Sequence, residues 1–219
     1  MYWLEKLKTK LSSLFKMKEV VTKQPSFVTT QPVPATRVTP PVVSLSLTEF
    51  KLCHGSKVME ICDRFNWSVS HADWLMACMS FETGGTFKAN EKNLAGSGAT
   101  GLIQFMPSTA KWLGTSTQKL SKMSNIEQLV YVEKYFKTYH RKIKTFGDMY
   151  MAILLPKFIG KPYNAVLFSD GIRYRLNSGL DINKDGKVTK KEALQKVLAH
   201  LRRGRSNANS RLIYIKDKK

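Results

Sequence analysis

Cysteine is scarce in this chain, and the few that occur fit no disulfide framework. The 219 residues include three cysteines, Cys53, Cys62 and Cys78, an odd number without a Cys-x-x-Cys pair. We therefore expect reduced thiols, and their spacing relative to His54 and His71 matches no zinc pattern. No apolar run approaches the roughly 18 residues of a membrane span, and no short apolar segment of a signal peptide follows the N-terminal lysines.

Acidic residues are also few, which leaves the chain strongly basic. Lys and Arg number 36 against 16 Asp and Glu, a formal net charge of +20. The last 49 residues, 171–219, hold 14 of the basic residues and four of the acidic ones. Such a charge predicts attraction to a polyanion, which could be nucleic acid, an acidic membrane surface or an anionic cell envelope.

The first 44 residues are organised differently from the rest. Residues 1–23 have the spacing of an amphipathic helix, with Leu4, Leu7, Leu11 and Leu14 separated by lysines. Such a helix either packs on a protein surface, its own domain or a partner, or lies on an acidic membrane. Residues 24–44 hold five of the eight prolines, which predicts a semi-extended tether.

Helical signals dominate from residue 45 onward, so we predict a mainly α domain over residues 45–203 followed by a basic tail, 204–219. Capping-box patterns predict helix starts at Ser70–Asp73, Ser124–Glu127, Thr145–Asp148 and Thr189–Glu192. Pro107 suits a first helical position. Strand-like alternation is nearly absent.

Glu82 is the strongest candidate for chemistry on local grounds. It lies where an apolar helix ends, two residues before the pair Gly84 and Gly85. The C-terminal end of a helix disfavours negative charge, and neighbours such as Trp74 and Phe81 would remove water from the carboxyl group. We expect both effects to raise the pKa of Glu82, as a general acid requires, although a surface position at the helix end is the alternative.

The residues around Glu82 resemble a known catalytic segment. Residues 80–90 read Ser-Phe-Glu-Thr-Gly-Gly-Thr-Phe-Lys-Ala-Asn, and residues 96–110 read Gly-Ser-Gly-Ala-Thr-Gly-Leu-Ile-Gln-Phe-Met-Pro-Ser-Thr-Ala. This segment is similar to that of the soluble lytic transglycosylases and goose-type lysozymes, and resembles most the phage-encoded members. The resemblance covers residues 73–114 and implies a lysozyme-like helical fold that acts on bacterial peptidoglycan.

The resemblance also implies roles for individual residues. Glu82 would protonate the glycosidic oxygen between N-acetylmuramic acid and N-acetylglucosamine, and Gln104 would lie in the saccharide groove. Thr83, Ser97 and Phe105 are further substrate-binding candidates from the same motif. The Ala-Tyr-Asn motif that usually follows is missing, and Tyr150 is the best substitute, with a buried core position as the alternative.

With Glu82 as the single candidate acid, two cleavage reactions are possible. Most glycosidases use two carboxylates, but here Glu91 lies among Lys88, Asn90 and Lys92, which is typical of a solvated loop. A single acid suffices if the substrate's N-acetyl group stabilises the cation and the muramic C6 hydroxyl attacks, yielding a 1,6-anhydro sugar. A positioned water would instead make the protein a muramidase.

Residues 181–192 match an EF-hand calcium loop. Oxygen-bearing side chains stand at Asp181, Asn183, Asp185, Thr189 and Glu192, Gly186 occupies the sharp turn, and Lys187 would contribute its carbonyl oxygen. Residues 171–179 look irregular, so we expect a structural clip and no sensor. An Asp-Gly turn with a capping box, without metal, is the alternative.

The context follows from these features as a hypothesis. The chain would be a phage lysin or a virion-associated protein that is made in the host cytoplasm without a signal peptide and acts in the periplasm, with residues 1–23 free to contact virion or tail proteins. The rivals from another class are a nucleic-acid-binding protein, which the basic tail permits without a recognised motif, and a structural virion protein with an inactive lysozyme-like domain.

Overall fold

A computed structural model of the chain describes the backbone of residues 52–56 and all of residues 57–93 and 96–206. The predicted helix 1–23, the tether 24–44, and most of the basic tail therefore lie outside the described residues, as does the side chain of Cys53. The elements in chain order are α2 (Leu52–Arg64), α3 (Val69–Glu82), α4 (Pro107–Trp112), α5 (Thr117–Leu120), α6 (Asn125–Phe136), η1 (His140–Lys142), α7 (Phe146–Leu154), η2 (Pro156–Phe158), β1 (Val166–Phe168), α8 (Gly171–Asn177), η3 (Ser178–Leu180), β2 (Val188–Thr189) and α9 (Lys190–Gly204).

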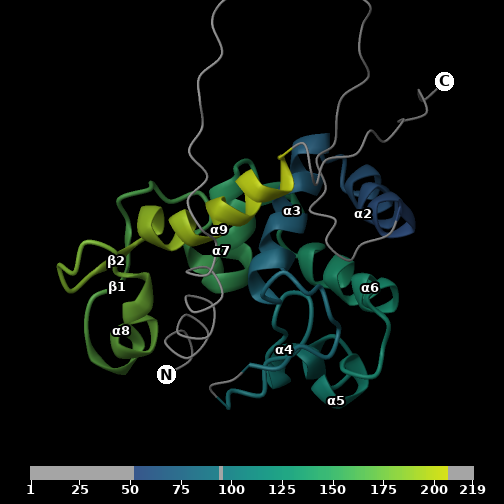
Figure 1. Cartoon of the computed structure of the whole chain (residues 1–219), viewed down its shortest axis with the longest axis horizontal. Coiled ribbons are helices and arrows are strands. Elements are labelled where there is room, and N and C mark those ends of the chain that lie inside the picture. Colours follow the sequence, from purple (N-terminus) through teal and green to yellow (C-terminus); the bar gives the residue numbers. More distant parts are fainter. Residues whose placement is uncertain (1–51, 94–95, 207–219) are drawn as a thin grey trace, which may run out of the picture.

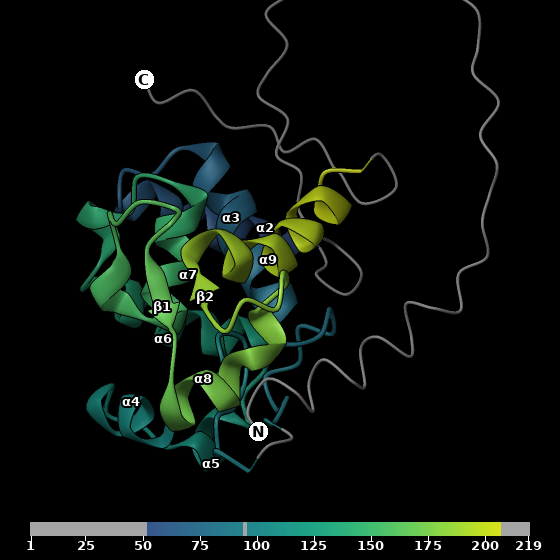
Figure 2. The ribbon, with the colours of Figure 1, turned by 90° about the vertical axis from the view of Figure 1, so that its left-hand side faces the viewer.

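The prediction of a mainly α, lysozyme-like fold is confirmed. The strands β1 and β2 form one short antiparallel pair, and every other element is helical. Figures 1 and 2 both place α4 and α5 together at one end of the molecule. In the described part of the chain, no helix combines the length and apolarity needed to cross a bilayer.

Helix α3 is the centre of the packing. It contacts α2, α7 and α9, and its residues 75–82 are all buried. Figure 1 shows α9 crossing beside α3. Because no side of α3 faces water over its last two turns, its residues form the middle of the hydrophobic core, and the helix ends inside the molecule.

Local capping chemistry sets most helix starts as predicted. The capping boxes Ser124–Glu127, Thr145–Asp148 and Thr189–Glu192 open α6, α7 and α9, and Pro107 is the first residue of α4. The prediction at Ser70 is wrong: α3 begins at Val69 with Ser68 as N-cap. The carboxylate of Asp73 instead accepts a hydrogen bond from the Arg205 Nε, at 3.0 Å, so it serves a tertiary contact.

The expectation of an irregular stretch before the calcium-type loop is also wrong. Helix α8 covers Gly171–Asn177 and continues into the 3₁₀ turn η3. The segment is short, and its conformational preference is weak enough that the contacts of α8 with β1 and η3 decide its structure.

A buried ion pair ties the C-terminal third of the fold to α7. The Lys190 Nζ lies 3.1 Å from Asp148 Oδ1, and both side chains are about 95% buried. Asp148 also accepts hydrogen bonds from the Thr145 hydroxyl and from the Gly160 N–H. The Lys190 Nζ donates to the carbonyl oxygen of Lys161 as well. The pair thus joins α7, the turn at 158–161 and the start of α9.

The two cysteines whose side chains the structure describes lie in the hydrophobic core. Cys62 and Cys78 are free thiols with no exposed surface. Burial, together with the nearby Asp63 and Asp73 carboxylates, raises the pKa of Cys62 to about 12. Burial likewise raises the pKa of Cys78 well above its usual value. Both thiols are therefore protonated at neutral pH and pack as small apolar side chains.

Candidate active site

Glu82 ends α3 at the wall of a cleft. The carboxylate is 4% exposed, and the helix stops there because Thr83 caps it and Gly84 and Gly85 turn the chain with positive φ angles of 74° and 90°. The cleft has a volume of about 610 Å³. Its lining comes from four regions of the chain: Glu82; Ser97, Ile103, Gln104 and Met106; Ile153, Leu154, Leu155 and Lys157; and Leu167, Phe168, Arg173, Leu176 and Asn177.

The cleft brings together three of the residues predicted from the sequence, Glu82, Ser97 and Gln104. The other candidates lie elsewhere. Thr83 is buried, and its hydroxyl donates to the Met79 carbonyl oxygen at 2.7 Å. Phe105 is buried, and Tyr150 is fully buried with its ring edge-on to Phe81. None of these three belongs to the cleft lining, so their part in substrate binding stays a prediction.

Gln104 is held in an uncommon conformation. Its φ is +52°, a left-handed value that non-glycine residues rarely adopt. The Gln104 side-chain amide donates to the carbonyl oxygens of Glu91 and Gly101, at 3.0 and 3.1 Å. Its Oε1 is buried and accepts no hydrogen bond from the residues that the structure describes. A buried acceptor without a donor is costly, which makes Gln104 a candidate to accept a hydrogen bond from a ligand in the cleft that it lines.

Glu91 lies in the loop that supports Gln104. Its carboxylate accepts a hydrogen bond from the Thr86 hydroxyl at 3.0 Å, and its carbonyl oxygen accepts from the Gly101 N–H at 2.8 Å. Glu91 is not among the residues that line the cleft. Glu82 is thus the one carboxylate of the cleft lining in the part of the chain that the structure describes.

Gln128 was not among the residues predicted from the sequence, and it anchors the glycine-rich loop. This α6 side chain is fully buried; its Oε1 accepts from the Leu102 N–H, and its amide donates to the carbonyl oxygens of Ala89 and Leu120. Gly101 must be glycine here, because its φ is +83° and a Cβ would overlap the Gln128 amide. The sequence did offer one signal: Gln128 is a polar residue on the face of α6 that also carries the buried Leu129 and Val132.

We expect Gln128→Leu to lower the free energy of unfolding by about 3 kcal/mol, because three buried backbone groups lose their partners. Chemical denaturation measures this loss of stability. The matched control is Gln118→Leu at an exposed position of α5, which should change stability by less than about 0.5 kcal/mol. Equal effects of the two substitutions would contradict the anchoring role.

Helix α9 packs against the C-terminal part of α3. The Ser80 hydroxyl is fully buried and lies 2.9 Å from the His200 Nδ1. A Cβ on Gly85 would lie 3.1 Å from the Arg203 guanidinium, so α9 also approaches the turn that follows Glu82. These contacts fix the end of the helix that presents the carboxylate.

The loop 181–192 has oxygen-donor chemistry that suits calcium, but its acidic side chains are engaged with the protein. The Asp181 carboxylate accepts hydrogen bonds from the Gly186 N–H and the Tyr174 hydroxyl, and Glu192 caps α9. Lys184 and Gly186 have positive φ angles of 62° and 82°. Within the described ranges, no group of three or more His, Cys, Asp or Glu residues could hold a metal ion.

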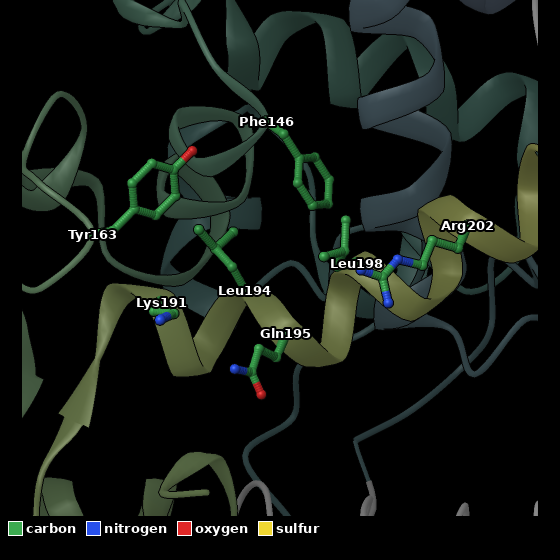
Figure 3. Close-up of a pocket in the computed structure, with 7 residues that line it drawn as sticks. All are labelled: Phe146, Tyr163, Lys191, Leu194, Gln195, Leu198 and Arg202. Carbon is green, nitrogen blue, oxygen red and sulfur yellow. The ribbon is translucent and has the colours of Figure 1, made fainter.

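A second hollow lies along the outer face of α9 (Figure 3). It has a volume of about 520 Å³ and is lined by Phe146, Tyr163, Lys191, Leu194, Gln195, Leu198 and Arg202. In Figure 3, Leu194 and Leu198 extend from α9 toward the side where the Tyr163 and Phe146 rings lie. None of these lining residues carries a carboxyl group, so this hollow offers no general acid.

Comparison with known families agrees with the site around Glu82. The family model described as Transglycosylase SLT domain matches residues 68–154, which is less than half of the chain and runs from the start of α3 to the end of α7. Neither the curated proteins nor the solved structures yielded a match. The matched part supplies Glu82, Ser97 and Gln104 to the cleft. Residues 68–154 are therefore similar to the transglycosylase SLT domain, a family that comprises lytic transglycosylases, and the similarity is consistent with an enzyme that acts on peptidoglycan.

Proposed function

We propose that this protein is a lytic transglycosylase that cleaves the β-1,4 bond between N-acetylmuramic acid and N-acetylglucosamine, with Glu82 as both acid and base. The observation that carries the proposal is the position of Glu82, which is 4% exposed at the end of α3 and lines the same cleft as Gln104. A general acid must lie within hydrogen-bond reach of the atom that it protonates, and this carboxyl group lines the cleft that would hold the glycan.

The proposed reaction uses one protein carboxyl group twice. Glu82 donates its proton to the glycosidic oxygen as the bond to the muramic C1 breaks, and the N-acetyl oxygen of the same sugar stabilises the cation. The Glu82 carboxylate then takes the proton of the muramic C6 hydroxyl as that oxygen bonds to C1. The products are a 1,6-anhydromuramyl end and a free N-acetylglucosamine 4-hydroxyl, and no water is consumed.

The test is mass spectrometry of the fragments that the protein releases from purified peptidoglycan. Anhydromuramyl ends, absent when Glu82→Gln replaces the wild type, would support the transglycosylase. Reducing ends would assign a muramidase that uses the same acid. Release of no fragments by the wild type would contradict the enzymatic proposal and favour an inactive lysozyme-like domain.

We propose separately that the loop 181–192 binds calcium as a structural clip, through Asp181, Asn183, Asp185, Thr189 and Glu192 and the Lys187 carbonyl oxygen. The identity of these oxygen donors and the two left-handed residues of the turn support this. Calcium at saturating concentration should raise Tm by about 5 °C, because it binds the folded chain alone. Magnesium at equal concentration and the Asp185→Ala variant, which removes an oxygen donor, are the controls; an unchanged wild-type Tm would contradict the proposal.

We propose that the protein is phage-encoded, made in the host cytoplasm and active at the wall, as a lysin or a virion component. The net charge of +20 suits an anionic envelope, and residues 1–23 supply a helix pattern for a virion protein or an acidic membrane. Proteomics of purified phage particles separates the two roles, since only a virion component co-purifies with them. Recovery with neither particles nor wall fractions of infected cells would contradict both.

A further inference from the structure

The cleft lining includes two cations whose side chains are exposed. Lys157, on η2, and Arg173, on α8, both line it together with Glu82. Neither side chain forms an ion pair within the described residues; the Lys157 Nζ lies 5.3 Å from the centre of the Phe158 ring. The lining thus holds one carboxyl group and two positive charges, an arrangement that attracts an anionic group on a ligand.

These cations lie outside the part of the chain that matches the SLT family. The match ends at residue 154, whereas one wall of the cleft is built from residues 155–177, on η2, β1 and α8. Around the cations that wall is apolar, through Leu155, Leu167, Phe168 and Leu176. The acid and Gln104 therefore come from the segment that matches the family, while the segment after it adds charge and apolar surface to the same cleft.

The chemistry of peptidoglycan supplies one kind of anion that fits. Its sugar rings are uncharged, but the muramyl residue carries a lactyl group linked to a short peptide. Carboxylates occur on that peptide, and on the lactyl group itself when the peptide has been removed. A polymer of N-acetylglucosamine alone carries none. Apolar surface beside a cation suits the methyl groups of lactyl and alanyl units next to a carboxylate.

We propose that Lys157 and Arg173 bind a carboxylate on the muramyl side chain and so make the cleft selective for peptide-bearing glycan over uncharged chitin-type glycan. This rests on the proposed function, since it assigns a substrate feature to the same cleft. Lys157 and Arg173 act in binding and specificity. The proton transfer remains with Glu82.

The test is a binding measurement on full-length protein carrying Glu82→Gln, which keeps the ligand intact. Calorimetry compares three ligands: a tetrasaccharide with stem peptides, the same glycan stripped by an amidase so that free lactyl carboxylates remain, and chitotetraose. Adding Lys157→Gln and Arg173→Gln should weaken binding of the peptide-bearing ligand by about tenfold and leave chitotetraose within about twofold. The stripped glycan tests how strict the contact is: a loss there as well means that the cations also bind a free lactyl carboxylate, and no loss confines the contact to the carboxylates of the peptide.

The matched control is the pair Lys161→Gln and Arg175→Gln in the same background. Both residues are exposed cations of the same segment that do not line the cleft, so they remove the same net charge and should leave all three affinities within about twofold. An equal loss for chitotetraose and the peptide-bearing ligand, or an equal effect of the control pair, would overturn the selectivity proposal.

Kinetics of the wild-type background separate this role from an effect on Glu82. A carboxylate-binding role predicts that Lys157→Gln with Arg173→Gln raises KM on peptidoglycan and leaves the pH profile of kcat in place. A displaced pH profile with unchanged KM would overturn the proposal and assign the cations to the ionisation of Glu82. Failure of the proposed function has a different signature, since the wild type would then release no fragments.

Discussion

Replacing Glu82 with glutamine is expected to reduce the rate of glycan cleavage by about a thousandfold or more, while the protein remains folded. Glutamine keeps the shape and the hydrogen-bonding capacity of the side chain but cannot donate the proton that the leaving oxygen needs, and general acid catalysis contributes about 10²–10⁴ in rate. Initial rates of fragment release measure the effect, and circular dichroism checks the fold.

Glu91→Gln is the matched control for this loss. Glu91 lies nine residues after Glu82, in the same catalytic segment, but its carboxylate bonds to Thr86 and does not line the cleft. We expect it to retain cleavage within about tenfold. A loss as large as that of Glu82→Gln would mean that two carboxylates share the chemistry, and would favour the muramidase.

Lys190→Met is expected to lower the free energy of unfolding by about 3 kcal/mol, because it leaves the buried Asp148 carboxylate without its cation. The control is Arg64→Met, which breaks the Arg64–Glu133 pair, whose Arg64 side chain is 43% exposed. That pair should be worth about 1 kcal/mol or less. Urea denaturation of both variants measures the difference, and equal losses would contradict the importance of burial.

The same pair gives the fold a dependence on pH. Burial of Asp148 tends to raise the pKa of its carboxyl, but hydrogen bonds from Gly160, Thr145 and Lys190 outweigh burial and hold that pKa below its usual value. A lowered pKa stabilises the fold above the unfolded-state value of about 3.9, and this contribution is lost as pH falls through the folded-state value. The wild type should therefore lose stability below about pH 4, and Asp148→Asn should lose less over the same range.

Features of the structure could be predicted from the sequence where the interactions that determine them join residues close together in the chain. Capping boxes and the glycine-rich motif act within a few residues, so the starts of α6, α7 and α9 and the position of Glu82 at a helix end could be predicted. The Ser70–Asp73 prediction failed because Asp73 bonds to Arg205, which lies 132 residues away. No local pattern indicates such a contact.

The cleft wall formed by residues 155–177 could not be predicted from the sequence for the same reason. Lys157 and Arg173 sit in short elements without a motif, and only the packing of α8 on β1, and of η2 on α7, brings them to the site of Glu82. Gln128 could be recognised only weakly from the sequence, as a polar residue at a helix position that is expected to be buried. The groove role assigned to Tyr150 rested on the family pattern, whereas the structure places this side chain in the core.

The burial of α3 on all sides has a consequence for how the cleft moves. Amide hydrogens of a helix enclosed by α2, α7 and α9 exchange with water only through openings close to complete unfolding. The short elements η2, β1 and α8 are expected to open locally at a lower free-energy cost. Hydrogen exchange should therefore be slower on the side of the cleft that carries the acid than on the side that carries the cations.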